Sequence, residues 1–160
     1  MQEKRKIMFV CLGNICRSPM AEFVFKDMLK KRGLVDKYEV LSSATSSDEI
    51  YMGVGNPVYP PAREELKKHG ISCEGKRAVQ LKANDYGKYD LFVCMDNSNV
   101  RNAIRIFGGD NEGKVKLLLD YVGGGEVADP WYYGHFDKTY DDILRGCEAL
   151  LNELESEQIE

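Results

Sequence analysis

The N-terminal part of the chain is an apolar run that ends at Cys11 and leads into a short loop rich in glycine, asparagine and arginine. Residues 7–10 are apolar throughout, as in a strand buried within a parallel sheet. Pro19 falls where the first turn of a helix would lie, and a first turn tolerates the missing N–H of proline. A strand, a tight loop and a helix in this order predict a parallel sheet with a crossover helix.

The loop from Cys11 to Arg17 has the residue types that build an anion site. Its backbone N–H groups can point inward, and the N-terminus of the following helix adds a partial positive charge. Gly13 and Asn14 tolerate the left-handed backbone that a tight cradle requires. Arg17 offers a planar, charged fork for two oxygens of a tetrahedral anion. We therefore expect a phosphate-binding loop formed by Leu12, Gly13, Asn14, Ile15, Cys16 and Ser18.

Cys11 lies at the centre of this positive loop. Positive surroundings lower the pKa of a thiol below its ordinary value of about 8.5, so we expect a thiolate at neutral pH. A thiolate beside a bound phosphate ester is an activated nucleophile. The alternative is structural: Cys11 and Cys16 could be buried apolar residues, and Arg17 a surface charge.

Two other kinds of site are disfavoured by spacing. A zinc site lacks a second pair of ligands, because Cys73, Cys94 and Cys147 are scattered and only two histidines are present. A nucleotide-binding P-loop is disfavoured because its Gly-x4-Gly-Lys-Ser/Thr pattern is absent. We therefore expect no metal site.

Length and composition limit the class of protein. A chain of 160 residues suits one domain, which we place at residues 1–160. No apolar run approaches the ~20 residues of a membrane span. Five cysteines without framework spacing indicate reduced thiols and a cytoplasmic location. The net charge of −4 argues against general binding of nucleic acid.

Strand-like and helix-like segments alternate along the chain. The expected strands are residues 6–10, 38–43, 90–95 and 115–118, and the expected helices are residues 19–32, 61–69, 97–107 and 136–155. This alternation predicts a single-domain α/β fold, with a four-stranded parallel sheet flanked by helices on both faces and doubly wound. Active sites of such sheets lie at the carboxyl ends of the strands, where Cys11 falls.

Two motifs and several shorter stretches resemble those of the low-molecular-weight protein tyrosine phosphatases. They occur in order over nearly the whole chain: residues 11–22 (CLGNICRSPMAE), 42–45, 55–57, 69–71, 94–99 and 129–132 (DPWY). The resemblance implies a hydrolase without cofactor that cleaves phosphotyrosine monoesters through a phosphocysteine intermediate, and that also acts as an acid phosphatase on aryl phosphates. Its expected partners are phosphotyrosine-containing proteins or peptides, with inorganic phosphate as product. We expect a monomer that binds neither nucleic acid nor membrane.

The same resemblance assigns the groups of the reaction. It implies that Cys11 attacks phosphorus, that Arg17 holds the phosphate oxygens, and that Asp129 protonates the leaving oxygen and later acts as base on water. Loop amides and the arginine would take the place of a metal ion. Trp131 and Tyr132 are expected to form the walls of the substrate cleft, which would grip a phenyl ring, and Leu12 and Ile15 its apolar floor.

A further set of residues is expected to support the loop. In the family a hydrogen-bond network holds the cradle, and the matching positions are Asn14, Ser18, Ser42 and His69. The Ser18 hydroxyl can also donate to the sulfur of Cys11. Asp96 follows the third apolar run, where it could brace Arg17 or act as a helix N-cap. In the family, a thiol at the position of Cys16 can form a disulfide with the nucleophilic cysteine. The resemblance therefore implies a reversible Cys11–Cys16 disulfide.

The chain departs from the family pattern in two places. Trp131 stands where the family usually has tyrosine. After residues 55–57 the chain reads VYPPA (residues 58–62) in place of the usual family pattern, and the preceding loop, residues 46–52, looks longer than is typical. This region borders the cleft in the family, so the substrate preference stays open. Ile50, Tyr51 or Met52 could touch substrate.

Three alternative functions remain. Protein-arginine phosphatases resemble this chain but carry threonine at the position of Ile15, and Ile15 favours an aryl phosphate. Arsenate reductases of this fold need two closely spaced relay cysteines, which Cys73, Cys94 and Cys147 do not supply. A catalytically silent phosphate-binding module would have no need of Cys11, Arg17 and Asp129 together.

Overall fold

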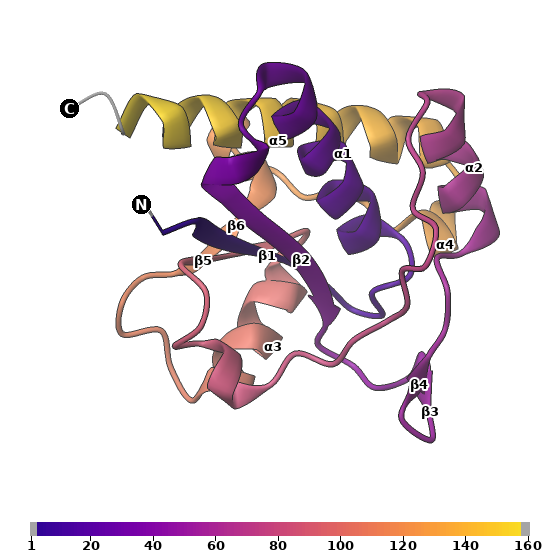
Figure 1. Ribbon diagram of the computed structural model, residues 1–160. Helices are drawn as coiled ribbons and strands as arrows, with labels where there is room; N and C mark the ends of the chain where they lie inside the picture. Colours follow the sequence, from indigo (N-terminus) through magenta and orange to yellow (C-terminus); the bar gives the residue numbers. More distant parts are fainter. Residues whose placement is uncertain (1–2, 158–160) are drawn as a thin grey trace.

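The computed structural model describes residues 3–157, apart from the side chains of Tyr132 and Tyr133. Its central sheet has four parallel strands within that range, in the order β2-β1-β5-β6 (Figure 1). The strands are β1 (Arg5–Cys11), β2 (Tyr38–Ala44), β5 (Leu91–Cys94) and β6 (Val115–Leu117). The four-stranded parallel sheet expected from the sequence is therefore confirmed.

Helices cover both faces of this sheet (Figure 1). One face carries α1 (Arg17–Arg32), α2 (Pro60–Lys68) and α5 (Phe136–Glu157), and the other carries α3 (Asn97–Phe107). A short helix, α4 (Pro130–Tyr133), precedes α5, and 3-10 turns form at η1 (Val35–Lys37), η2 (Ala83–Asp85) and η3 (Leu118–Val122). The doubly wound α/β fold is confirmed, and α1 begins two residues earlier than the expected start at Pro19.

The central strand β1 is buried on both faces because its side chains alternate between two cores. Ile7 and Phe9 pack into the larger core with α1 and α5, whereas Met8 and Val10 pack into the smaller core with α3. This double burial explains the continuous apolar run in the sequence. It also carries Cys11, the last residue of β1, to the carboxyl edge of the sheet.

The first turn of helix α1 faces the sulfur of Cys11, which accepts the backbone N–H of Ser18 at 3.4 Å. Its N-cap residue is Cys16, which makes no side-chain capping hydrogen bond, and the first turn contains no acidic residue. Four N–H groups at a helix start normally need partners from caps, water or ligands. The C-terminus is closed in the usual way, since Gly33 takes a left-handed conformation with φ of 68°.

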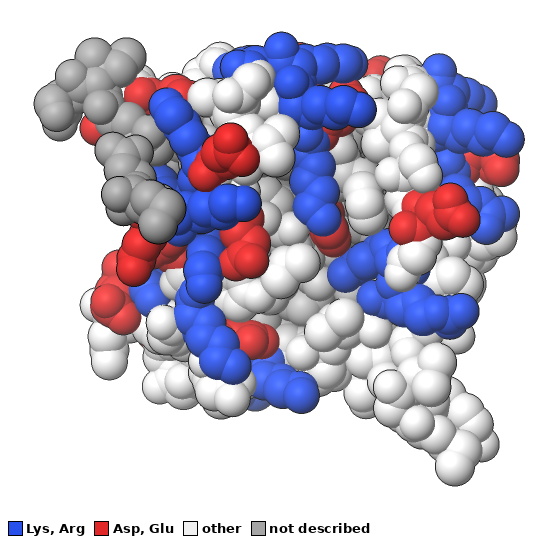
Figure 2. Space-filling view, viewed as in Figure 1, with Lys and Arg blue, Asp and Glu red and all other residues white. Residues whose placement is uncertain are grey.

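The segment between β2 and α2 contains a small hairpin, which the sequence did not reveal. Strand β3 (Ile50–Tyr51) pairs antiparallel with β4 (Val54–Gly55), and the turn residues Met52 and Gly53 both have positive φ. A Cβ at position 55 would overlap the backbone of Ala78, so glycine is required there. Figure 2 shows the region over β3 and β4 as an uncharged protrusion from this face of the molecule.

Candidate active site

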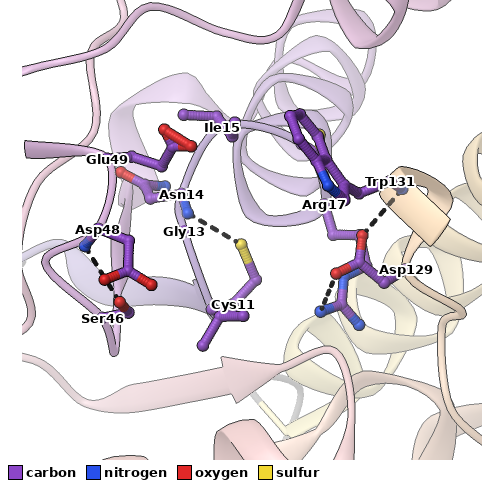
Figure 3. A pocket seen from close by; sticks show the side chains of 12 residues that line it. Cys11, Gly13, Asn14, Ile15, Arg17, Ser46, Asp48, Glu49, Asp129 and Trp131 are labelled. Carbon is purple, nitrogen blue, oxygen red and sulfur yellow. Dashed lines mark hydrogen bonds and ion pairs between the residues drawn. The ribbon is translucent and has the colours of Figure 1, made fainter.

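A cavity of about 210 Å³ opens at the carboxyl end of β1 (Figure 3). The whole loop from Cys11 to Arg17 lines it. Asp129 and Trp131 lie on one side, and the opposite side is formed by Ser46, Asp48 and Glu49. The structure thus brings together, around one cavity, most of the residues that the sequence assigned to phosphate binding, proton transfer and the aromatic cleft.

The sulfur of Cys11 is buried and faces three hydrogen-bond donors. The backbone N–H of Asn14 lies 3.2 Å from Sγ, and the backbone N–H of Ser18 lies 3.4 Å from it. The Ser18 hydroxyl oxygen is 3.0 Å from the same sulfur. These donors are the amides of the loop and of the first turn of α1, as expected for an anion-binding cradle.

Asn14 and Gly13, two neighbouring residues of the loop, differ in their backbone conformation. Asn14 has φ of 59°, so the left-handed conformation expected there is present. Gly13 is not among the residues with positive φ, and a Cβ there would lie 3.2 Å from Cγ of Glu49, so that the Glu49 side chain would have to shift by a few tenths of an ångström. The expectation of a left-handed Gly13 was therefore wrong.

Arg17 is almost fully buried below the cavity, with a side chain only 4% exposed. One terminal nitrogen of its guanidinium, Nη1, donates to Asp96 Oδ2 and to the carbonyl of Val127, each at 2.8 Å. The other terminal nitrogen, Nη2, lies 3.6 Å from Asp129 Oδ2. Burial on its own would lower the pKa of Arg17, but the negative charges at Cys11, Asp96 and Asp129 outweigh it and raise the pKa. The guanidinium is therefore a permanent charge with a defined orientation.

Asp129 ends the loop that leads into α4. Its Oδ1 accepts the backbone N–H of Trp131 at 3.0 Å, so the carboxylate caps α4, and Pro130 occupies the first turn of that helix. The other oxygen points toward Arg17 (Figure 3). The carboxylate is thus held beside the cavity and across it from the loop.

The Trp131 ring is 53% exposed and is supported from one side by Tyr59, with ring centroids 4.6 Å apart. Tyr59 also donates its backbone N–H to the carbonyl of Ile15 at 2.8 Å. One residue therefore joins the loop around Cys11 to the aromatic wall. Leu12 and Ile15 line the cavity as expected, whereas the Tyr132 side chain lies outside the described residues.

A buried hydrogen-bond network holds the loop from behind. The Asn14 side-chain amide donates to Ser18 Oγ at 2.7 Å and to Ser42 Oγ at 2.9 Å. Ser42 donates to Glu22 at 2.6 Å, and Lys76 Nζ lies 3.5 Å from the same carboxylate. Ser18 Oγ accepts from Asn14, and its own hydrogen can go to Cys11 Sγ at 3.0 Å or to the carbonyl oxygen of Ser43 at 3.5 Å, of which the sulfur is the nearer.

The assignment of His69 to this network was wrong. Its Nε2 lies 3.1 Å from Glu65 Oε2, and its ring stacks on Tyr140 with centroids 3.7 Å apart. Lys76 takes the place expected for a histidine, and burial lowers the pKa of its amine while Glu22 opposes that shift. No sequence pattern pointed to the contact between Lys76 and Glu22, because the two residues lie far apart in the chain.

Cys16 also lines the cavity, and its thiol is buried. Burial raises the pKa of the Cys16 thiol, and the negative charges at Cys11 and Asp129 raise it further, with Arg17 opposing. Both thiols are free. The expected Cys11–Cys16 disulfide stays a prediction.

Sequence reasoning missed one side of the cavity. It pointed to Ile50, Tyr51 and Met52 as residues that could touch substrate, but the lining residues of this segment are Ser46, Asp48 and Glu49. Tyr51 and Met52 are 77% and 85% exposed on the hairpin beyond it.

Residues 3–157 were also compared with what a metal site and a membrane-spanning helix require. No group of three or more His, Cys, Asp or Glu side chains in the described chain is placed to hold a metal ion. None of the helices described there is long and apolar enough to cross a bilayer.

The fold and the site define a class of protein, an α/β domain whose first strand ends in a cysteine-and-arginine anion loop. Residues 6–159 match the family of low molecular weight phosphotyrosine protein phosphatases. The low molecular weight protein-tyrosine-phosphatase YfkJ of Bacillus subtilis is 38% identical over 155 residues, covering 95% of this chain and 97% of that protein. A low molecular weight phosphotyrosine protein phosphatase of Gallus gallus is 37% identical and covers 93% and 95%, respectively. The chain belongs to this family.

Solved structures agree on the fold. The crystal structure of YfkJ from Bacillus subtilis superposes with a TM-score of 0.89 at 36% identity, over 98% of each chain. The crystal structure of DARP, a drosophila arginine phosphatase, superposes with a TM-score of 0.82 at 31% identity, over 93% of this chain and 97% of that one.

Proposed function

We propose that this protein hydrolyses phosphotyrosine monoesters through a phosphocysteine intermediate. The observation that supports this most is the surroundings of Cys11, where three donors face one sulfur and Arg17 lies in the same cavity. A thiol in such surroundings is suited to act as a nucleophile toward a bound phosphate.

In the first step, the Cys11 thiolate attacks phosphorus in line with the leaving oxygen. Loop amides and Arg17 stabilise the charge on the three equatorial oxygens. The P–O bond to the leaving group breaks, and Asp129 gives its proton to that oxygen, so that a neutral phenol leaves. A positioned acid of this kind contributes typically ~10²–10⁴-fold.

In the second step, a water molecule attacks the phosphocysteine from the side that the phenol has left. Asp129, now ionised, takes a proton from the water as the S–P bond breaks. The electron pair returns to sulfur, where the Ser18 hydroxyl can donate to the re-formed thiolate at 3.0 Å. The product is inorganic phosphate, and the enzyme has its starting protonation states again.

The walls of the cavity favour an aryl phosphate. Trp131 offers an exposed aromatic face, and Leu12 and Ile15 supply apolar surface from the loop. Stacking of a phenyl ring on such a wall adds about 0.5–1.5 kcal/mol beyond the burial of area. We therefore place phosphotyrosine, and aryl phosphates in general, ahead of phosphoserine as substrates.

Protein-arginine phosphatase is the second candidate, because DARP shares this fold at 31% identity. Ile15 argues against it, since an apolar side chain in the loop offers nothing to a guanidinium. Arsenate reduction ranks lower, because Cys73 lines a second cavity while Cys94 ends β5 and Cys147 lies within α5. A non-enzymatic phosphate-binding module is the remaining alternative.

We further propose one domain over residues 1–160, acting as a monomer on phosphotyrosine-containing proteins in the cytoplasm. The proposed location is supported by the five cysteines, all of which are free, because reduced thiols are typical of cytoplasmic proteins.

The test is turnover of p-nitrophenyl phosphate at mildly acidic pH with EDTA present, for the wild type beside Cys11→Ser. We expect turnover in the wild type and none in the variant, while phosphate binding is retained. Residual turnover in Cys11→Ser would exclude Cys11 as the nucleophile. No turnover in freshly reduced wild type would favour the phosphate-binding module.

A further inference from the structure

The cavity has two carboxylates on the side that faces Trp131. Asp48 and Glu49 both line it, and they come from the segment between β2 and β3 (Figure 3). Neither carboxylate has a part in the proposed reaction. Each would repel an incoming phosphate, so their presence at a phosphate cavity calls for a compensating interaction.

The Glu49 side chain is held in place beside the loop. The Asn56 side-chain amide donates to Glu49 Oε2 at 2.9 Å, and the two residues are also joined through the backbone at 2.8 Å. Cγ of Glu49 packs so close to Gly13 that a Cβ at Gly13 would lie 3.2 Å away. The charge of Glu49 is therefore fixed at the cavity rather than spread over a mobile surface side chain.

Asp48 is exposed and open to an outside partner. Its backbone N–H donates to Ser46 Oγ at 3.1 Å, which positions the residue. Within the described part of the chain, its carboxylate has no hydrogen bond or ion pair. A cation brought by the substrate would find one oriented carboxylate at Glu49 and one free carboxylate at Asp48.

We propose that Asp48 and Glu49 select phosphotyrosines that are flanked by lysine or arginine. The proposal rests on the proposed phosphatase function and names its substrate class. The phosphoryl group would occupy the loop around Cys11, the phenyl ring would lie against Trp131, and the neighbouring basic side chain would lie on the opposite, acidic side. The cation offsets the repulsion that the two carboxylates exert on the phosphate.

The hairpin that follows suits a polypeptide substrate. Directly after Glu49, the chain enters β3 and presents Tyr51, Met52 and Val54, which are 77%, 85% and 59% exposed. Aromatic and methionine side chains are enriched where proteins bind other proteins. The substrate is thus a basic segment of a phosphoprotein rather than a small phosphate ester.

The experiment compares two phosphotyrosine peptides of about ten residues, identical except for lysine or glutamate on both sides of the phosphotyrosine. We expect kcat/KM of the wild type to be about fivefold higher for the lysine peptide at low ionic strength, the ratio that corresponds to ~1 kcal/mol from an exposed ion pair. At ~1 M salt the preference should fall toward unity, because the Debye length shrinks to about 3 Å.

The decisive variant is the double substitution Asp48→Asn with Glu49→Gln, and its control is Glu64→Gln with Glu74→Gln. The control changes net charge equally, and its residues line a different cavity. The first variant should lose most of the preference and hydrolyse p-nitrophenyl phosphate with a lower KM. The control should keep the preference. Equal rates on both peptides in the wild type, or an unchanged preference in the first variant, would overturn the proposal.

Two further outcomes separate this proposal from the proposed function. Absence of p-nitrophenyl phosphate turnover in the wild type would overturn both. Robust turnover of that ester with equal peptide rates overturns the selection of basic flanks alone. Faster release of phosphate from a phosphoarginine peptide than from the lysine peptide would also overturn it, since the cation would then carry the phosphoryl group itself.

Discussion

Asp96 binds two partners at once: Oδ2 accepts from the Arg17 guanidinium at 2.8 Å, and Oδ1 accepts the backbone N–H of Asn99 at 2.8 Å. The sequence left bracing and helix capping as alternatives, and the structure shows both. One carboxylate thereby joins the buried arginine of the cavity to the start of α3, on the far face of the sheet (Figure 1).

Asp96→Asn should damage both roles, because an amide has only one accepting oxygen. If that oxygen keeps accepting the backbone N–H of Asn99, the NH₂ group of the amide faces the Arg17 guanidinium. Both groups are hydrogen-bond donors, so the contact between them becomes unfavourable. We expect a loss of about 1–3 kcal/mol in the free energy of unfolding, and a kcat/KM for p-nitrophenyl phosphate lower by roughly tenfold, mostly through KM. Urea denaturation and steady-state kinetics measure the two effects.

Asn99→Ala is the matched control for Asp96. Its side chain closes the same cap, since Oδ1 of Asn99 accepts the N–H groups of Met95 and Asp96 at 3.2 Å, but it does not touch Arg17. This variant should lose stability and keep its KM. A KM that rises as much as in Asp96→Asn would show that the cap alone, and not the arginine contact, matters.

Asp129→Asn tests the proton donor with the cap of α4 intact, because the amide oxygen can still accept from Trp131. The amide cannot protonate a leaving group. We expect kcat/KM, which reports the first step, to fall by about 10²–10⁴-fold for phenyl phosphate, and by less for p-nitrophenyl phosphate, whose leaving group needs less help. A leaving-group series measures the difference, and equal losses across the series would remove Asp129 as the acid.

Tyr59→Ala should loosen the aromatic wall. The ring of Tyr59 supports Trp131 at 4.6 Å, and the backbone bond to Ile15 does not depend on the side chain. Trp131 is the single tryptophan of the chain, so its fluorescence reports directly on this contact. We expect an emission shift toward that of a solvated tryptophan and a kcat/KM for aryl phosphates several-fold lower, since an aromatic pair contributes about 0.5–1.5 kcal/mol.

Tyr59→Phe keeps the ring and serves as the control for that contact. Its emission and kinetics should match those of the wild type. If Tyr59→Ala also leaves the emission unchanged, the ring of Tyr59 has no part in holding Trp131.

The sequence predicted what depends on neighbouring residues. The apolar run of β1, the loop around Asn14, and Pro19 in the first turn of α1 are local signals, so the strand, the cradle and the helix follow from them. The alternation of elements then places Cys11 at the carboxyl edge of the sheet. Asp129 carries no local signal of this kind, and it was found through the resemblance to the family.

The errors lie where residues distant in the sequence meet. His69 was placed in the network by its motif, but α2 turns it toward Glu65 and Tyr140. Lys76 reaches Glu22 because the chain after α2 returns to the sheet, which no periodicity reveals. Glu49 was missed for the same reason, since its place at the cavity depends on its pairing with Asn56 across the hairpin.

Tyr121 lies in η3, and the pKa of its phenol makes the stability of the fold depend on pH at alkaline pH. Burial raises the pKa of its phenol to about 12, and the negative charges of Glu153 and Glu157 on α5 add to that effect. The unfolded chain has an ordinary tyrosine pKa of about 10. The folded state therefore holds the phenolic proton more tightly, and this contribution to stability is fully present below pH 10 and is lost as pH rises toward 12.

Tyr121→Phe removes that titration. The difference in unfolding free energy between the wild type and the variant should stay constant from pH 7 to about pH 10, and above that the wild type should lose stability relative to the variant as pH rises. The limit is ~1.4 kcal/mol per pH unit, and partial solvent contact will keep the slope below it. Urea denaturation followed by circular dichroism at pH 8, 10 and 11 measures the trend, with Tyr51→Phe on the exposed hairpin as the control. A difference that stays the same at pH 11 would mean that Tyr121 titrates alike in the folded and unfolded chains, and that neither burial nor the carboxylates of α5 raise the pKa of its phenol.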